Sequence, residues 1–131
     1  MQEHGTFDIT TTGQTIRVRL YDQWNYETSV RCCHEAKTEA LLICDRPWAF
    51  LIDLSKWELG TPDCYAPFED VNRWASKNNQ ICEASIIKLA IHQNIIEQTD
   101  LAFNGVKTKI FYNEQEALFW LESQGISTKG E

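Results

Sequence analysis

The sequence contains no long apolar run and no block of basic residues, and these two absences exclude whole classes of protein. No apolar run is longer than the one at residues 48–52, which ends at Asp53, whereas a helix that spans a membrane needs about twenty apolar residues. Twelve basic residues stand against nineteen acidic ones, and the net charge of −7 opposes binding to nucleic acid and to anionic membrane surfaces. The composition predicts a globular chain that neither binds nucleic acid nor inserts into a membrane.

The sequence also lacks the patterns that accompany secretion. Residues 1–5 contain neither the basic segment nor the apolar segment of a signal peptide. The number of cysteines, five, is odd, and no two of them have the C-x-x-C spacing. We therefore expect reduced thiols and a cytoplasmic location.

Glycine is scarce, with six residues, and no glycine-rich phosphate loop is present. The serine-nucleophile patterns Ser-x-x-Lys and Gly-x-Ser-x-Gly are absent as well. Cys32, Cys33 and His34 are adjacent on a predicted helix, where neighbouring side chains point about 100° apart, so they do not share one metal ion. The sequence predicts no cofactor, no metal site and no catalytic constellation.

The periodicity of the apolar residues predicts nine elements in the order β-β-α-β-α-β-α-β-α. Alternating apolar positions on both sides of Gly13 predict a β-hairpin with one wet face. The later strands are predicted at residues 48–54, 82–91 and 108–112. The helices are predicted at residues 26–42, within 61–77, at 94–103, and from the cap Asn113 to Gly125.

Two of these helices carry specific expectations. For residues 26–42, Asp22 or Asn25 is the expected cap. The expected buried stripe contains Val30, Cys33, Lys37, Ala40 and Leu41. In the second helix, Pro67 implies either a kink or a regular helix that begins near this proline after a single turn.

Residues 48–54 are apolar on both faces of the strand until Asp53, which is typical of a central strand covered by helices on both sides. A helix between the hairpin and this strand implies parallel pairing. The sequence therefore predicts a single α/β domain with a mixed, mostly parallel sheet and about four helices. Its core extends over about residues 6–124, and the tail of residues 126–131 is expected to be flexible.

In its whole element order, from Phe7 to Leu121, the chain resembles the SpoIIAA-like group of the STAS superfamily, the anti-sigma-factor-antagonist fold. The residues that carry the resemblance are Phe50-Leu51-Ile52-Asp53-Leu54-Ser55, Trp57, Gly60-Thr61-Pro62, and the closing pattern Phe111-Tyr112, Ala117 and Trp120-Leu121. The resemblance implies a STAS-like domain with a non-enzymatic interaction or regulatory role. Through Sec14-type relatives, it also implies a small apolar ligand or lipid as the alternative.

The resemblance further implies a modification site. In the best-understood antagonists, a serine at the start of the helix after this strand is phosphorylated within an Asp-Ser-Ser-Gly motif. This sequence has Leu59-Gly60-Thr61-Pro62 at that place, so the motif is missing and Thr61 is the nearest hydroxyl. Thr61 and Ser55 are therefore the candidate phosphorylation sites.

The candidate binding surface starts at Asp53, which is expected at the carboxyl end of a central strand, where open α/β sheets bind ligands. Ser55, Trp57 and Thr61 follow beside the amino end of a helix, which favours anions. Alternatively, Asp53 and Ser55 bind loop backbone, Trp57 fills a gap, and Thr61 caps the helix.

Two of the five tryptophans, Trp24 and Trp57, fall in predicted loops or at element edges. Either they are exposed for an interface or ligand pocket, or they are partly buried against helices. Trp48, Trp74 and Trp120 fall on predicted buried faces. We therefore expect the contact surface to include Trp24 together with the segment 53–61.

The sequence favours a cytoplasmic interaction module that binds a protein partner or a second copy of itself. The first alternative is a carrier of a small molecule or lipid. A weaker alternative is an enzyme that uses Cys64, His92 or Asp53, because a thiol at the amino end of a helix is activated. Against this, Cys64 also fits the buried stripe of its helix, and His92 fits a strand-end histidine bonded to solvent.

Overall fold

A computed structural model of the chain describes residues 2–100 and 105–130. Its elements follow the predicted order, with one 3₁₀ turn added before the second helix. The strands are β1 (Thr6–Thr12), β2 (Thr15–Trp24), β3 (Trp48–Gly60), β4 (Gln80–Ile86) and β5 (Lys107–Phe111). The helices are α1 (Tyr26–Leu41), the 3₁₀ turn η1 (Pro62–Cys64), α2 (Tyr65–Ser76), α3 (Ala90–Asp100) and α4 (Glu114–Ser123). The predicted α/β class is confirmed.

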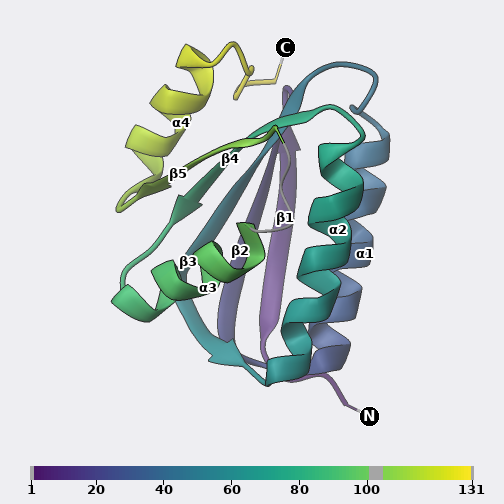
Figure 1. Ribbon diagram of the computed structural model, residues 1–131, viewed down its shortest axis with the longest axis vertical. Coiled ribbons are helices and arrows are strands. Elements are labelled where there is room, and N and C mark those ends of the chain that lie inside the picture. The colour runs from purple at the N-terminus through teal and green to yellow at the C-terminus, as the bar shows by residue number, and fades with distance from the viewer. Residues whose placement is uncertain (1, 101–104, 131) are drawn as a thin grey trace.

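The strands form one sheet in the order β1-β2-β3-β4-β5. β1 pairs with β2 in antiparallel orientation, and the remaining neighbours pair in parallel. The sheet is therefore mixed and mostly parallel, as the crossover argument predicts. Figure 1 shows α1 and α2 side by side along one face of the sheet, whereas α4 packs on the other face against β3, β4 and β5.

The central strand β3 is buried on both faces in its first half. Phe50 and Leu54 belong to the core under α1, α2 and α3. Ala49 and Leu51 face the opposite way and pack with Ala117 of α4. Helices on both sides explain why this stretch is an unbroken apolar run.

The helix starts follow the local sequence signals. Asn25 caps α1 by accepting a hydrogen bond from the Thr28 amide at 3.2 Å, and Asn113 caps α4 by accepting one from the Glu116 amide at 2.9 Å. Pro67 is the third residue of α2, where a helix needs no donor from it, and the helix begins after the single turn η1. Among the described helices, none is long and apolar enough to cross a membrane.

The predicted stripe of α1 is only partly right. Val30 is 40% exposed and Leu41 is 58% exposed, although both were assigned to the buried face. The residues that contact the core are Cys32, Ala36 and Ala40. The apolar stripe is therefore shifted, because small side chains let the helix approach the sheet and the larger ones are turned outward.

The boundary between the fourth strand and the third helix also differs from the prediction. β4 ends at Ile86, and α3 begins at Ala90 rather than at Asn94. Leu89 and Ile91, which were assigned to the strand, are exposed at the start of the helix. The helical turn forms early because His92 accepts a hydrogen bond from the Leu89 amide through Nδ1. The predicted helix end at Phe103 lies outside the described residues.

The C-terminal tail packs against the hairpin instead of being free. Ile126 is 2% exposed and belongs to the core under α4. The Gln14 amide and the Thr15 hydroxyl both donate to the Ser127 carbonyl, at 3.0 and 2.9 Å. The Thr12 hydroxyl donates to the Thr128 carbonyl at 3.0 Å. The expected frayed tail is therefore wrong for residues 126–128, because a buried apolar side chain and hydrogen bonds to the hairpin hold them.

Replacing Ile126 by alanine should lower the free energy of unfolding by about 2–5 kcal/mol, because it removes a fully buried side chain. The exposed neighbour Lys129 provides the control, and K129A should change stability by less than about 0.5 kcal/mol. Urea unfolding followed by tryptophan fluorescence measures both variants. Equal stability of I126A and the parent chain would show that the tail is not packed in solution.

Candidate functional site

The predicted site residues do not form one cluster, because β3 is longer than predicted. The strand continues through Asp53 to Gly60 and stays paired with β2, with Lys56 opposite Tyr21 and Trp57 opposite Asp22. Eight extended residues place Thr61 roughly 26 Å from Asp53. The expectation that Asp53 lies at the carboxyl end of the strand is therefore wrong.

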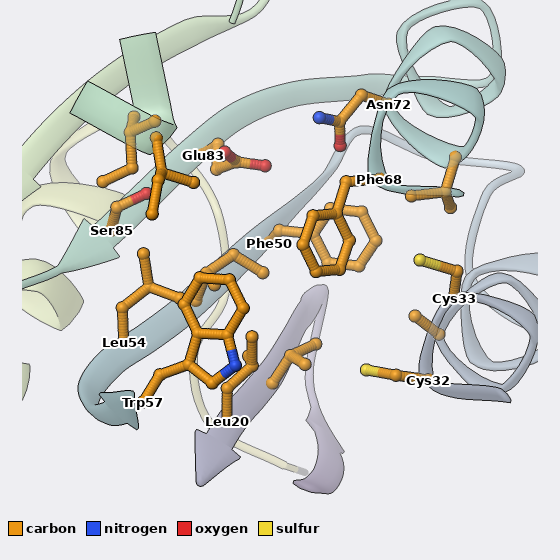
Figure 2. A pocket seen from close by; sticks show the side chains of 16 residues that line it. Leu20, Cys32, Cys33, Phe50, Leu54, Trp57, Phe68, Asn72, Glu83 and Ser85 are labelled. Atoms are coloured by element: carbon orange, nitrogen blue, oxygen red, sulfur yellow. The ribbon is translucent and has the colours of Figure 1, made fainter. Parts of the chain in front are cut away.

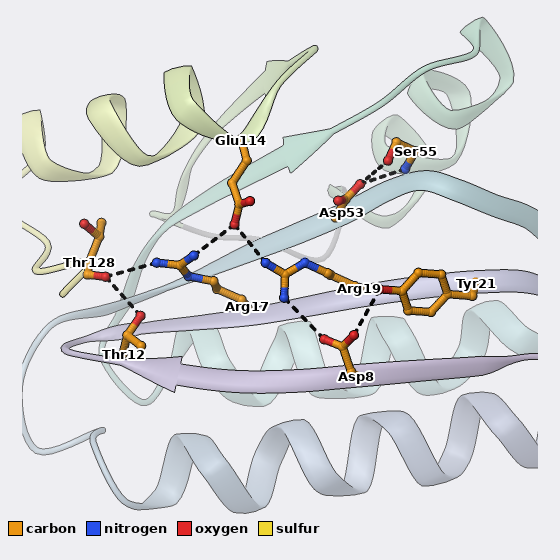
Figure 3. A network of polar contacts seen from close by, with 9 residues as sticks. All are labelled: Asp8, Thr12, Arg17, Arg19, Tyr21, Asp53, Ser55, Glu114 and Thr128. Atoms are coloured by element: carbon orange, nitrogen blue, oxygen red, sulfur yellow. Dashed lines mark hydrogen bonds and ion pairs between the residues drawn. The ribbon is translucent and has the colours of Figure 1, made fainter. Parts of the chain in front are cut away.

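Asp53 and Ser55 lie in the middle of the strand, on the sheet face that the first three helices do not cover. One carboxylate oxygen of Asp53 accepts from the Ser55 amide at 2.9 Å and from the Ser55 hydroxyl at 2.6 Å. Figure 3 shows this pair beside the polar side chains of the hairpin. The pair therefore satisfies its own local backbone, which is the simpler of the two interpretations of these residues.

Trp24 and Trp57 are core residues, each 2% exposed, so the expectation that they are exposed at a contact surface is wrong. Their rings meet edge to face at a centroid distance of 5.8 Å. Trp57 also contacts Phe68 at 6.1 Å and Tyr65 at 6.5 Å, both from α2. This aromatic cluster fixes the first turns of α2 against the ends of β2 and β3.

Thr61 is exposed at the carboxyl end of β3, and its side chain makes no capping hydrogen bond to the following turn. Its hydroxyl donates to the Asp63 carboxylate instead, and its amide donates to the Trp24 carbonyl at 3.3 Å. The preceding Gly60 is required by space, because a β-carbon there would lie 2.8 Å from the Cys64 sulfur. Of the two candidate phosphorylation sites, Thr61 has the accessible hydroxyl.

The cysteines are all free thiols, and burial dominates their chemistry. Burial raises the pKa of the Cys64 thiol and raises the pKa of Cys33 to about 12. Cys64 is the last residue of η1 and stands directly before α2, but burial raises its pKa, so the activation expected from its position does not arise. In the described part of the chain, no three His, Cys, Asp or Glu side chains come together as metal ligands.

His92 is a buried structural residue of α3 rather than a strand-end histidine in contact with solvent. Its Nε2 lies 2.9 Å from the Trp57 carbonyl oxygen, and its Nδ1 accepts from the Leu89 amide at 3.4 Å. Both bonds are satisfied when the ring carries its hydrogen on Nε2. His92 therefore ties the start of α3 to the end of β3.

A charged network on the open sheet face was not foreseen from the sequence. Glu114 of α4 bridges Arg17 and Arg19 of β2 at 3.0 Å each, and Asp8 of β1 accepts from Arg19 and from Tyr21 (Figure 3). The signal was the alternation of arginine with apolar residues along β2. The acidic partner comes from a helix almost a hundred residues later, which the strand pattern does not reveal.

A cavity of about 90 Å³ lies between the sheet and the helices α1, α2 and α3 (Figure 2). Trp57 is the one predicted site residue that lines it. The polar residues Asn72, Glu83 and Ser85 also line it and are all buried. Sequence reasoning missed these three, although the polar residues Glu83 and Ser85 interrupt an otherwise apolar strand.

Comparisons with known proteins support the fold and no closer relationship. No protein-family model and no curated protein matches the amino-acid sequence. An uncharacterised DUF3478-family protein with a SpoIIAA-like fold from Shewanella loihica matches with a TM-score of 0.68 and 13% identity, over 92% of this chain and 96% of that one.

Two anti-sigma factor antagonists match as well. SpoIIAA in its unphosphorylated form gives a TM-score of 0.65 at 10% identity, over 89% of this chain and 98% of that one. An antagonist from Mycobacterium paratuberculosis gives 0.58 at 14% identity, over 89% and 93%. The chain therefore has the SpoIIAA-like fold that the element order indicates.

Cys64 should be a slow thiol at pH 7, because its raised pKa leaves little thiolate to react. Iodoacetamide labelling followed by peptide mass spectrometry measures its rate, and the half-buried Cys44 in the loop after α1 is the internal reference. The Cys64 rate should rise with pH across the alkaline range. Labelling of Cys64 ahead of Cys44 at pH 7 would contradict the buried, inactive thiol.

Glu114→Gln should destabilise the fold by about 1 kcal/mol, because it removes the carboxylate charge that bridges the guanidinium groups of Arg17 and Arg19. Glu116 is the matched control, since it lies in the same first turn of α4 and bridges no arginine in the described structure. Thermal unfolding at low and high salt compares E114Q with E116Q. Equal effects of the two variants, or a difference that does not shrink with salt, would argue against the network.

Proposed function

We propose that this chain is a non-catalytic regulatory module that acts by binding a partner protein. The observation that carries the proposal is the fold, which it shares over 89% of its length with two anti-sigma factor antagonists. By their names, those proteins act on another protein. The same mode of action is proposed here, with the partner left to experiment.

The contact surface proposed for this module is the carboxyl edge of β3. Glu58, Thr61, Pro62 and Asp63 are all exposed there. In open parallel sheets, this edge is where binding sites are built. Two carboxylates within six residues favour a partner that presents basic side chains. The buried Trp24 and Trp57 support this surface from below instead of forming part of it.

Thr61 is the residue at this edge on which regulation by phosphorylation would act. Its hydroxyl is exposed, whereas the Ser55 hydroxyl is bonded to Asp53 in the middle of the sheet. A phosphoryl group on Thr61 would stand beside the Asp63 carboxylate and repel it. Modification would therefore change the shape and charge of the proposed contact at the same time.

The thiol inventory supports a cytoplasmic location for such a module. All five cysteines are free, and Cys32, Cys64 and Cys82 are buried as small apolar side chains. A reducing compartment preserves thiols in this state.

Charge reversal tests whether this edge, rather than another part of the surface, binds the partner. The tagged chain is purified from its own cells under mild cross-linking, and the binding of any stoichiometric protein partner is then measured by calorimetry with purified components. D63R should weaken that binding at least about tenfold, because it places a cation where a basic partner approaches. Asp45, exposed at the opposite edge of the sheet, provides the matched reversal D45R, which should leave binding unchanged.

Circular dichroism confirms that both variants keep the fold. Equal loss of binding in D63R and D45R would show a general charge effect and remove this edge as the contact. A chain that co-purifies with no partner, in cells that express it at its natural level, would overturn the proposed function.

A further inference from the structure

The cavity between the sheet and the helices is lined mainly by apolar side chains, from β2 and β3 on one side and from three helices on the other. Val18, Phe50 and Leu54 form its floor on the sheet. Helices α1, α2 and α3 close it through Ala36, Phe68 and Ile95, among others. A cavity of roughly 150 Å³ with such walls admits benzene in other proteins, so about 90 Å³ suits a molecule of a few non-hydrogen atoms.

Polar groups are gathered at one end of this apolar space. Glu83 and Ser85 come from β4 and Asn72 from α2, and each is less than a tenth exposed. Figure 2 shows the Glu83 carboxylate and the Asn72 carboxamide directed toward one another across the upper part of the cavity. Small-molecule sites usually combine mostly apolar walls with a few polar groups.

The indole nitrogen of Trp57 is the unusual feature of the cavity wall. It is buried, and the part of the chain that the structure describes provides no hydrogen-bond acceptor for it. The other two fully buried tryptophans are satisfied: Trp24 donates to the Tyr21 carbonyl at 3.0 Å, and Trp48 donates to the Asn78 carbonyl at 2.7 Å. Because buried donors are almost always paired, the Trp57 N–H indicates an acceptor that residues 2–100 and 105–130 do not supply.

The ring cannot turn easily to find an acceptor elsewhere. Trp24, Tyr65 and Phe68 contact it from three directions. Its own carbonyl is held by His92 at 2.9 Å. In Figure 2, the nitrogen lies on the edge of the ring that faces across the cavity toward Cys32. The donor is therefore fixed in position on the cavity wall.

A route from solvent to the cavity lies between α1 and α2. A groove of about 300 Å³ on the outer surface of these helices is lined by Tyr26 and Trp74, among others. Cys33 and Val71 line both the groove and the cavity. Two side chains of moderate size thus lie between the cavity and the open groove.

We propose that this cavity binds a small, uncharged organic molecule with an apolar body and a hydrogen-bond acceptor that receives the Trp57 N–H. An anionic ligand is disfavoured, because the buried carboxyl group of Glu83 already lines the cavity. The volume excludes a lipid chain in this conformation. The molecule enters between α1 and α2, past Cys33 and Val71.

Nuclear magnetic resonance of the full chain labelled with nitrogen-15 tests the site through the tryptophan indole signals. The probes are acetone and cyclobutanone, which carry a carbonyl acceptor on a body of three or four carbon atoms, and sodium acetate as the anionic counterpart. The two neutral probes should shift the Trp57 indole signal to saturation, and the Trp24 and Trp48 signals should move much less. Acetate should leave all three unchanged.

Two variants show whether the N–H itself binds. W57F keeps an aromatic ring and removes the donor, and it should weaken acetone binding about tenfold. Trp120 on the opposite face of the sheet provides the matched control W120F, which should bind as the parent chain does. If W57F does not fold, the proposal is still tested, because the signal shift is measured in the parent chain.

Three results would overturn the proposal: no saturable shift of the Trp57 signal with either neutral probe, shifts confined to the residues of the outer groove, or equal affinity of a folded W57F variant. None of these measurements involves a protein partner, so they leave the proposed function untouched.

Discussion

Parallel pairing of β2 with β3 along nearly their whole lengths is the constraint on which the rest of the structure depends. It begins with Thr15 opposite Ala49 and ends with Trp24 opposite Gly60. Because parallel strands need a crossover, α1 has to return across the sheet, and its small core residues let it lie close. The same pairing brings the rings of Trp24 and Trp57 together, and α2 packs against these rings through Phe68. Two register shifts and the left-handed Asp22 let β2 follow the longer strand.

The order of elements could be predicted because each helix and strand has a strong local signal. Asn25 and Asn113 cap helices through contacts within four residues, which a sequence reveals directly. The length of β3 could also have been inferred, since Lys56 and Glu58 alternate with Trp57 and Leu59 in the period of a strand. Asp53 interrupts the apolar run without ending the strand, because local hydrogen bonds from Ser55 satisfy its carboxylate.

The cavity and the packed tail could not be predicted, because both depend on groups far apart in the chain. Ile126 reaches the core only after α4 has docked beside β4 and β5. In β4, the polar Glu83 and Ser85 alternate with the apolar Cys82, Ala84 and Ile86, which is the pattern of a strand with one wet face. In the fold, helices cover both faces of β4, so its polar side lines the cavity instead of facing solvent. Sequence patterns report which side of a strand is polar, but the tertiary structure decides what that side meets.

The segment of residues 57–61 is held at its two ends by different parts of the molecule. The carbonyl of Trp57 is bonded to His92 of α3, and the amide of Thr61 is bonded to the Trp24 carbonyl of β2. The backbone between these bonds is fixed on both sides, which orients the indole N–H toward the cavity before any ligand arrives. A donor that is already oriented loses little conformational freedom on binding, so even a molecule of a few atoms gains from meeting it. The same rigidity presents Thr61 and Asp63 at the edge of the sheet in one arrangement. The interior site and the exposed edge thus owe their geometry to the same short segment of β3.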